Sequence, residues 1–222
     1  DLESTSGTVS ILPNVRMSVL KQDQNAYDAY NVMDTVIMGN QRLYEVGREK
    51  EAIYAKEEMT DEDGMRACEL EEEYAELGGW EAESDASRIL QGLGVGTEFH
   101  SNDMATLDAR LKVKVLLAQA LFGSPDLLMM DEPTNNLDIY HATNMMKIVR
   151  RLCDELGKTV ILVLHEINYA AFYSDYICAF KDGKIAKFGT VEEVMTKENL
   201  SQIYQVDFEI LTIAGKPLSI YY

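Results

Sequence analysis

Apolar residues recur along this chain in runs and spacings that predict alternating strands and helices. Two unbroken apolar runs, at residues 127–130 and 160–164, are typical of strands that are buried on both faces of a parallel sheet. Residues 139–156 lie between them with apolar positions at helical spacing, and Gly157 follows as a helix-ending residue. The order of strand, helix and strand predicts an α/β fold with a doubly wound parallel sheet.

The region at residues 32–93 has a helical pattern and predicts a helical sub-domain inserted into the α/β core. The core then comprises residues 1–31 and 94–222. Within the sub-domain, helical spacing over residues 32–54, and again up to about Leu77, predicts a helical hairpin. Its glutamates indicate a solvated face in preference to a metal site: Glu69, Glu71, Glu72, Glu73 and Glu76.

Shorter elements complete the expected fold, and turn residues separate them. No internal repeat or low-complexity linker interrupts them. We expect strands at residues 8–12, 17–20 and 176–180, helices at 82–93, at 112–122 and from 167, two short helices within 191–204, and hairpins that join 176–180 to 185–187 and 208–213 to 217–221.

Composition narrows the class of protein. The chain has 222 residues, 46% of them hydrophobic, which suffices for one large domain or a domain with a sub-domain. No apolar stretch reaches the ~18 residues of a membrane helix, and the first residues do not resemble a signal peptide. Three widely spaced cysteines argue against a disulfide framework and favour a cytoplasmic protein. The net charge of -18 argues against direct binding to nucleic-acid phosphates.

Polar residues that can carry chemistry follow both buried strands. Asp131 and Glu132 come directly after the first strand, and His165 follows the second. Ligands of open α/β sheets bind beyond the carboxyl ends of the strands. A carboxylate at such a place can hold Mg²⁺ while its neighbour activates a water for phosphoryl transfer. Taken alone, the two carboxylates also fit an acidic turn, and His165 also fits a packed or helix-capping residue.

The string around these carboxylates, Leu-Leu-Met-Met-Asp-Glu-Pro-Thr-Asn-Asn-Leu-Asp at residues 127–138, resembles the Walker B motif and D-loop of ATP-binding cassette (ABC) ATPases. The resemblance to ABC ATPases covers nearly the whole chain, but two parts of the chain resemble two different ABC families. Residues 1–139 resemble the ABC-F family, whose members act on ribosomes, through residues 34–39, 92–94 and the helical hairpin. Residues 140–222 resemble the ATPase subunit of ferric-siderophore importers, through residues 156–160, 164–168, 173–177 and 181–184. We therefore hypothesise a mosaic, or chimera, of the two.

The resemblance implies a P-loop-NTPase-like sheet core and a role for each matching polar residue. Gln22 would contact Mg²⁺ and the attacking water, Asp131 would hold Mg²⁺ through water, and Glu132 would be the general base. Asp138 would be the D-loop aspartate, and His165 the switch histidine that contacts the γ-phosphate. Mg-ATP is the implied cofactor, and a second ATPase chain is the implied partner.

Two phosphate-binding parts of the family pattern have no counterpart in these 222 residues. No Gly-x-x-x-x-Gly-Lys-Ser/Thr string occurs, and Gly157-Lys158-Thr159 leaves a helix to enter a strand, which is the reverse context. The signature Leu-Ser-Gly-Gly is replaced by a sequence in which Asp108 adds a negative charge that Arg110 partly offsets. Since each hydrogen bond to a charged group is worth ~1.5–3 kcal/mol, we expect weak binding of Mg-ATP and no hydrolysis by this chain alone.

Three functions stay open at this point. The chain is an ABC-type ATPase fragment with a Mg²⁺ and water half-site, a non-catalytic scaffold that presents its acidic hairpin to a protein partner, or half of a split ATPase completed by a P-loop-bearing chain. In the family, the P-loop strand lies beside the strand that ends at His165. We therefore expect residues 176–180, or another chain, to fill that place.

Overall fold

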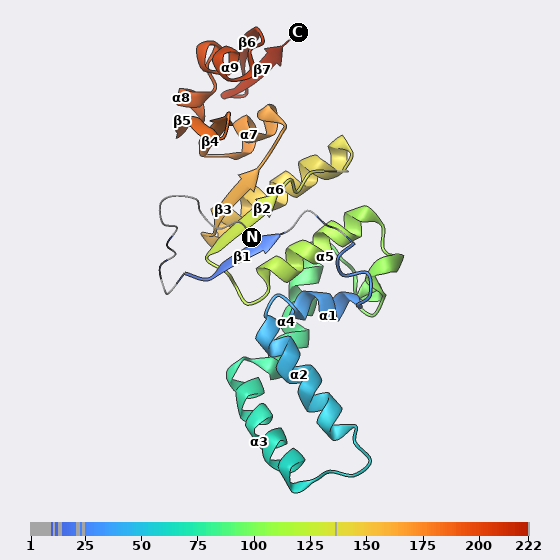
Figure 1. Ribbon diagram of the computed structural model, residues 1–222. Helices are drawn as coiled ribbons and strands as arrows, with labels where there is room; N and C mark the ends of the chain where they lie inside the picture. The colour runs from blue at the N-terminus through green and yellow to red at the C-terminus, as the bar shows by residue number, and fades with distance from the viewer. Residues whose placement is uncertain are drawn as a thin grey trace. The chain divides into compact units, whose positions relative to one another are not determined.

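A computed structural model describes residues 10, 12, 15–20, 23, 25–135 and 137–221 (Figure 1). The strand expected at residues 8–12 lies outside these residues except for Ser10 and Leu12, neither of which is in a strand. Contacts divide the chain into two compact units. The first unit comprises Asp1–Met130 and Lys158–Ile161, and the second comprises Asp131–Gly157 and Leu162–Tyr222. The predicted division into a core and a helical sub-domain at residues 32–93 stays a prediction.

The fold is mixed α/β with a parallel sheet, as the sequence predicted. Strand β1 (Met17–Leu20) pairs in parallel with β2 (Leu127–Asp131), in a register that places Met17 beside Leu127 and Leu20 beside Met130. Strand β3 (Thr159–Val163) follows β2 in the sheet order β1-β2-β3. Along β2, Leu128 and Met130 are fully buried while their neighbours are half-buried, so burial on both faces is only partial.

Helix α5 (Ala109–Leu121) is the buried centre of the first unit. It packs against β1 and against two helices, α1 (Val32–Ile37) and α4 (Ala82–Gly92). Its buried residues include Lys112, whose ammonium donates to Asn25 Oδ1 at 2.8 Å and to Asp28 Oδ1 at 2.5 Å. A buried ammonium needs such partners, because an unpaired charge inside a protein is costly.

The expected continuous helix over residues 32–54 was wrong, because the chain breaks between α1 and α2 (Gln41–Tyr54). The break contains Gly39, where a Cβ atom would lie 2.0 Å from the backbone oxygen of Gln119 on α5. Only glycine permits so close an approach. Asn40 then caps the new helix, since its side chain accepts from the N–H of Leu43 at 3.3 Å. The tertiary contact with α5 therefore decides where the helix breaks.

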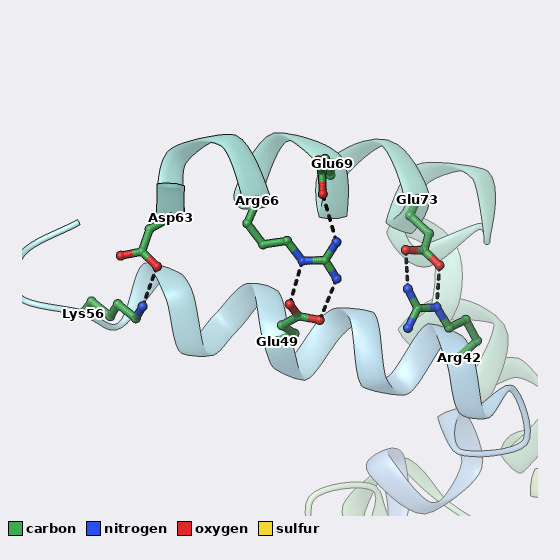
Figure 2. Close-up of polar contacts among 7 residues, drawn as sticks. All are labelled: Arg42, Glu49, Lys56, Asp63, Arg66, Glu69 and Glu73. Atoms are coloured by element: carbon green, nitrogen blue, oxygen red, sulfur yellow. Dashed lines mark hydrogen bonds and ion pairs between the residues drawn. The ribbon is translucent and has the colours of Figure 1, made fainter. Parts of the chain in front are cut away.

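The predicted helical hairpin consists of α2 and α3 (Asp61–Glu76), which lie side by side in Figure 1. Its helices share a small core of buried apolar residues: Val46, Ile53, Ala67 and Leu70. Ion pairs between the helices run along one side (Figure 2), with Arg42 bound to Glu73, Arg66 to Glu49 and Lys56 to Asp63. The acidic face is thus partly occupied by the hairpin's own basic side chains.

The second unit begins with the amphipathic helix α6 (Ile139–Leu156), which ends at Gly157 in a left-handed conformation with φ 62°, as predicted. Helix α7 (Ile167–Tyr173) leads to the antiparallel pair β4 (Tyr176–Lys181) and β5 (Lys184–Thr190). Two short helices, α8 (Val191–Val194) and α9 (Lys197–Tyr204), precede the antiparallel hairpin of β6 (Phe208–Ile213) and β7 (Lys216–Tyr221). A core of Ala171, Val191, Met195, Leu200 and Phe208 joins these elements.

The expectation that residues 176–180 fill the place beside the second buried strand was wrong. Strand β4 forms a separate two-stranded sheet with β5, and within the described residues β3 has β2 as its only neighbour. Ile161 and Val163 on β3 are 47% and 49% exposed. The hairpin turn at Asp182 and Gly183 offers β4 a local partner, which costs less loop entropy than a distant one.

Candidate functional site

The site begins where β2 ends, because the backbone turns sharply at Glu132. This residue has a φ of 47°, in the left-handed region that a glutamate rarely adopts. Two backbone hydrogen bonds hold the turn: the N–H of Glu132 donates to the oxygen of Val163 at 3.1 Å, and the N–H of Asn135 donates to the oxygen of Glu132 at 3.0 Å. A strained backbone that is fixed from both sides is typical of functional sites.

This turn brings the Glu132 carboxylate into contact with two side chains. One carboxylate oxygen contacts Nε2 of His165, and the other accepts a hydrogen bond from the side-chain amide of Asn135. The Glu132 side chain is 18% exposed and the His165 side chain is 79% exposed. The structure therefore brings together the two residues that the sequence assigned to catalysis, with the carboxylate largely withdrawn and the imidazole open to solvent.

A pocket of about 580 Å³ adjoins this pair. Helices α6 and α7 supply its apolar and aromatic wall, and burial raises the pKa of Tyr173. Two carboxylates, one imidazole and two tyrosine hydroxyls provide its ionisable groups, and the described lining residues include no lysine or arginine. The described lining residues are Glu132, Thr134, Asn135, Leu137, Ile139, Ala142, His165, Glu166, Asn168, Tyr169, Phe172 and Tyr173.

Residues directly after His165 explain how the imidazole is placed. The side chain of Glu166 accepts from the N–H of Asn168 at 2.9 Å and caps α7. Capping starts the helix two residues after His165, at the end of the chain segment that continues from β3. The imidazole is therefore tied to the position of α7.

Of the other predicted site residues, Asp131 and Asp138 are not among the described lining residues of the pocket, and Gln22 lies outside the described chain. Asp131 is the exposed last residue of β2 and does not line the pocket. Asp138 caps α6, where hydrogen bonds from the backbone N–H and then the imidazole of His141 hold the pKa of its carboxyl below the usual range. Gln22 lies outside the described residues, so its predicted role beside Mg²⁺ stays a prediction.

The segment in place of the signature motif has a defined local structure. Asp108 caps α5 by accepting from the N–H of Leu111 at 2.9 Å. The guanidinium of Arg110 donates to the same carboxylate at 2.5 Å, and this contact, followed by the capping bond, lowers the pKa of Asp108. The expected offset of one charge by the other is thus a direct ion pair.

The pocket does not by itself fit a nucleoside triphosphate. Phosphate recognition needs cationic or N–H donors aimed at the oxygens. The described lining has two carboxylates and no lysine or arginine, and its amides, Asn135 and Asn168, donate to Glu132 and to the Ser219 carbonyl. Over the described ranges, no group of three or more His, Cys, Asp and Glu side chains is placed to hold a metal ion. Within the same ranges, no helix is long and apolar enough to cross a membrane. The arrangement can orient and deprotonate a water, which is a task for a carboxylate paired with an imidazole.

Two residues in this site were missed by the sequence reasoning. Asn135 lies within the string at residues 127–138, three positions after Glu132, and Asn168 lies three positions after His165. A polar residue three positions after a catalytic candidate was the signal available for each. Only the folded turn at Glu132 and the start of α7 show that both line the pocket.

Solved ABC structures share this fold. The chain superimposes on a metal-chelate type ABC transporter in an inward-facing conformation with a TM-score of 0.71 and 17% sequence identity, covering 98% of this chain and 75% of that one. It superimposes on MJ1267, an ATP-binding cassette of an ABC transporter in its ADP conformation, with a TM-score of 0.60 and 17% identity, covering 85% and 68%. No protein-family model matches the chain.

Sequence relatives are named as ATP-binding proteins. The chain is 48% identical over 169 residues to YkpA, an ABC transporter ATP-binding protein of Bacillus subtilis, which covers 76% of this chain and 31% of that protein. It is 40% identical over 197 residues to the ATP-binding protein YbiT of Escherichia coli O157:H7. This match covers 88% of this chain and 36% of YbiT. It is 39% identical over 125 residues to FatE, a petrobactin import ATP-binding protein of Bacillus anthracis, covering 56% and 50%.

These relatives and structural neighbours are ATP-binding cassette ATPases, and siderophore importer subunits are among them. The chain spans about a third of the length of the first two relatives. The match of 169 residues to YkpA is longer than residues 1–139, so similarity to one relative extends into the part that resembles importers.

Proposed function

We propose that the chain is the water-activating part of an ATP-binding cassette. In this proposal Glu132 is the general base, His165 is the switch residue, Asp131 holds Mg²⁺ through water, and phosphate binding comes from a P-loop on another segment or chain. The contact of Glu132 with His165 at the pocket supports the proposal most directly. The described lining residues include no lysine or arginine, which supports the proposal that phosphate binding comes from elsewhere, because cationic groups are strong partners for a triphosphate.

Calorimetry with Mg-ATP tests whether the chain lacks a phosphate-binding loop. We expect no binding up to millimolar nucleotide by the chain, and none by the Glu132→Gln variant, since neither has a phosphate cradle. Micromolar binding by either protein would contradict the proposal, because some other loop would then hold the phosphates.

Complementation tests the assigned roles. We expect ATPase activity to appear when the chain is mixed with a segment of a curated relative's cassette that contains the P-loop. Glu132→Gln and His165→Ala should abolish this activity. Glu192→Gln, an exposed change of the same kind on α8, is the matched control and should retain it. Activity that survives Glu132→Gln would remove Glu132 from its proposed role.

A scaffold function is the second candidate, and the α2–α3 hairpin favours it. The hairpin has its own apolar core and its own ladder of ion pairs, so its shape depends little on the rest of the unit. Deletion of residues 44–78 should then abolish binding to a protein partner and leave the remaining chain folded. Loss of folding in that variant would contradict an independent hairpin.

The biological setting is part of the proposal. The mosaic of ABC-F and importer sequence stays a hypothesis. The two settings that it implies, the ribosome and siderophore import, stay hypotheses too. Pairing with a second cassette is supported by a solved bacterial ABC transporter cassette, MJ0796, that is dimeric and shares the fold with a TM-score of 0.53.

A further inference from the structure

The C-terminal hairpin is joined to the helix after His165 by one asparagine. Asn168 on α7 makes three hydrogen bonds to a single residue of β7, Ser219. Its side-chain oxygen accepts from the Ser219 backbone N–H at 2.8 Å and from the Ser219 hydroxyl at 2.9 Å. Its side-chain amide donates to the Ser219 carbonyl at 3.2 Å. The amide thus pairs with the backbone of β7 as a neighbouring strand would.

This junction is buried and is supported by apolar contacts. Ser219 is 4% exposed, so its polar groups depend on Asn168 in place of water. On the same helix, Ala171 belongs to the core that includes Phe208 of β6, and Ile167 packs against that core. One side of α7 is therefore fastened to the β6–β7 hairpin.

The same helix also borders the site. Asn168, Tyr169, Phe172 and Tyr173 line the pocket beside Glu132 and His165. Glu166, the residue directly after His165, caps α7, so His165 is joined to the start of the helix through a single residue. Asn168 both lines the pocket and bonds to the hairpin.

We propose that Asn168 is a positioning residue that couples the β6–β7 hairpin to His165, so that the hairpin sets how the imidazole meets Glu132. Whatever binds or displaces the hairpin would then alter the contact between His165 and Glu132. The inference rests on the proposed role of this pair. Its test needs no nucleotide, so the two ideas can fail separately.

Nuclear magnetic resonance of the imidazole groups can test the coupling, because the chain has three histidines. His100, His141 and His165 give separate ring signals, and His165→Gln assigns the third. Glu132→Gln should shift the His165 signal, since the carboxylate contacts that ring. In an Asn168→Ala background, most of this response should be lost, while His100 and His141 keep their positions.

Two further variants separate positioning from general weakening. Ser219→Ala removes the hydroxyl bond and leaves both backbone bonds to Asn168, so the response of His165 should be largely retained. Asn199→Ala is the matched control, because that amide donates to Glu193 and Val194 carbonyls elsewhere in the same unit. It should leave the response of His165 intact.

The outcomes divide clearly. A full response of His165 in the Asn168→Ala protein, or an equal loss in the Asn199→Ala protein, would overturn the coupling and leave the proposed function standing. If Glu132→Gln alone does not shift the His165 signal, the contact between Glu132 and His165 is absent in solution. That result would overturn this inference as well.

Discussion

Individual carboxylates in this chain are held by a few specific contacts. Glu132 has its backbone in a left-handed turn and its two oxygens on His165 and Asn135. Asp63 is the corresponding case in the helical hairpin, since it closes a capping box with Thr60 and pairs with Lys56. These contacts lower the pKa of Asp63 to about 2, with the Lys56 bond as the largest cause and the Thr60 bonds next.

Asp63 therefore predicts a pH dependence of stability with a definite sign. Its pKa is lower in the folded chain than its ordinary value of 3.8, so its stabilising effect is full above about pH 4 and is lost as the pH falls through about 2. We expect Asp63→Asn to lower the melting temperature at pH 7 and the difference from wild type to shrink steadily between pH 4 and pH 2. Asp61→Asn, a charge loss in the same helical turn, should cost less at pH 7. A difference that does not depend on pH would contradict this account.

At the scale of whole elements, the effect of a glycine on a helix depends on what lies next to it. Gly39 lies against the backbone of α5, whereas Gly64 on α3 has nothing within 4 Å of where a Cβ would stand. The two positions therefore form a matched pair of substitutions with opposite expected signs.

Gly39→Ala should lower the free energy of unfolding by about 1–3 kcal/mol, the range for forcing an extra carbon into packed structure. Gly64→Ala should raise it by about 0.5–1 kcal/mol, because alanine loses less conformational freedom in a helix. Chemical denaturation of both variants measures the two changes. Equal effects at the two glycines would show that the break before α2 has another cause.

At the scale of the whole molecule, strand β3 is an apolar strand with exposed side chains. Within the described chain it pairs with β2 alone, and Ile161 and Val163 are about half exposed. Apolar edge strands are templates for pairing with other chains. The cassettes of known structure that share the fold are longer than the matched region, which leaves room in them for a segment that this chain does not match.

Ile161→Lys should therefore reduce self-association of the chain, because it replaces an exposed apolar side chain of the edge strand with a charge. Light scattering over a range of protein concentrations measures the effect. Thr159→Lys places the same charge at another exposed position of β3 that is already polar, and it should change little. Equal scattering by the Ile161→Lys variant and the wild type would mean that self-association does not involve β3.

The sequence by itself determined most of the helices and strands, and it indicated Glu132 and His165 as candidate site residues. Helix caps at Thr60, Gly157 and Thr190, and the period of apolar residues, are set by neighbours a few positions away, so the elements could be predicted. Only the tertiary structure decided the break at Gly39, the separate β4–β5 sheet, and the contacts of Glu132 and Asn168. Each of these depends on residues distant in the sequence or on a backbone turn, which local patterns do not encode.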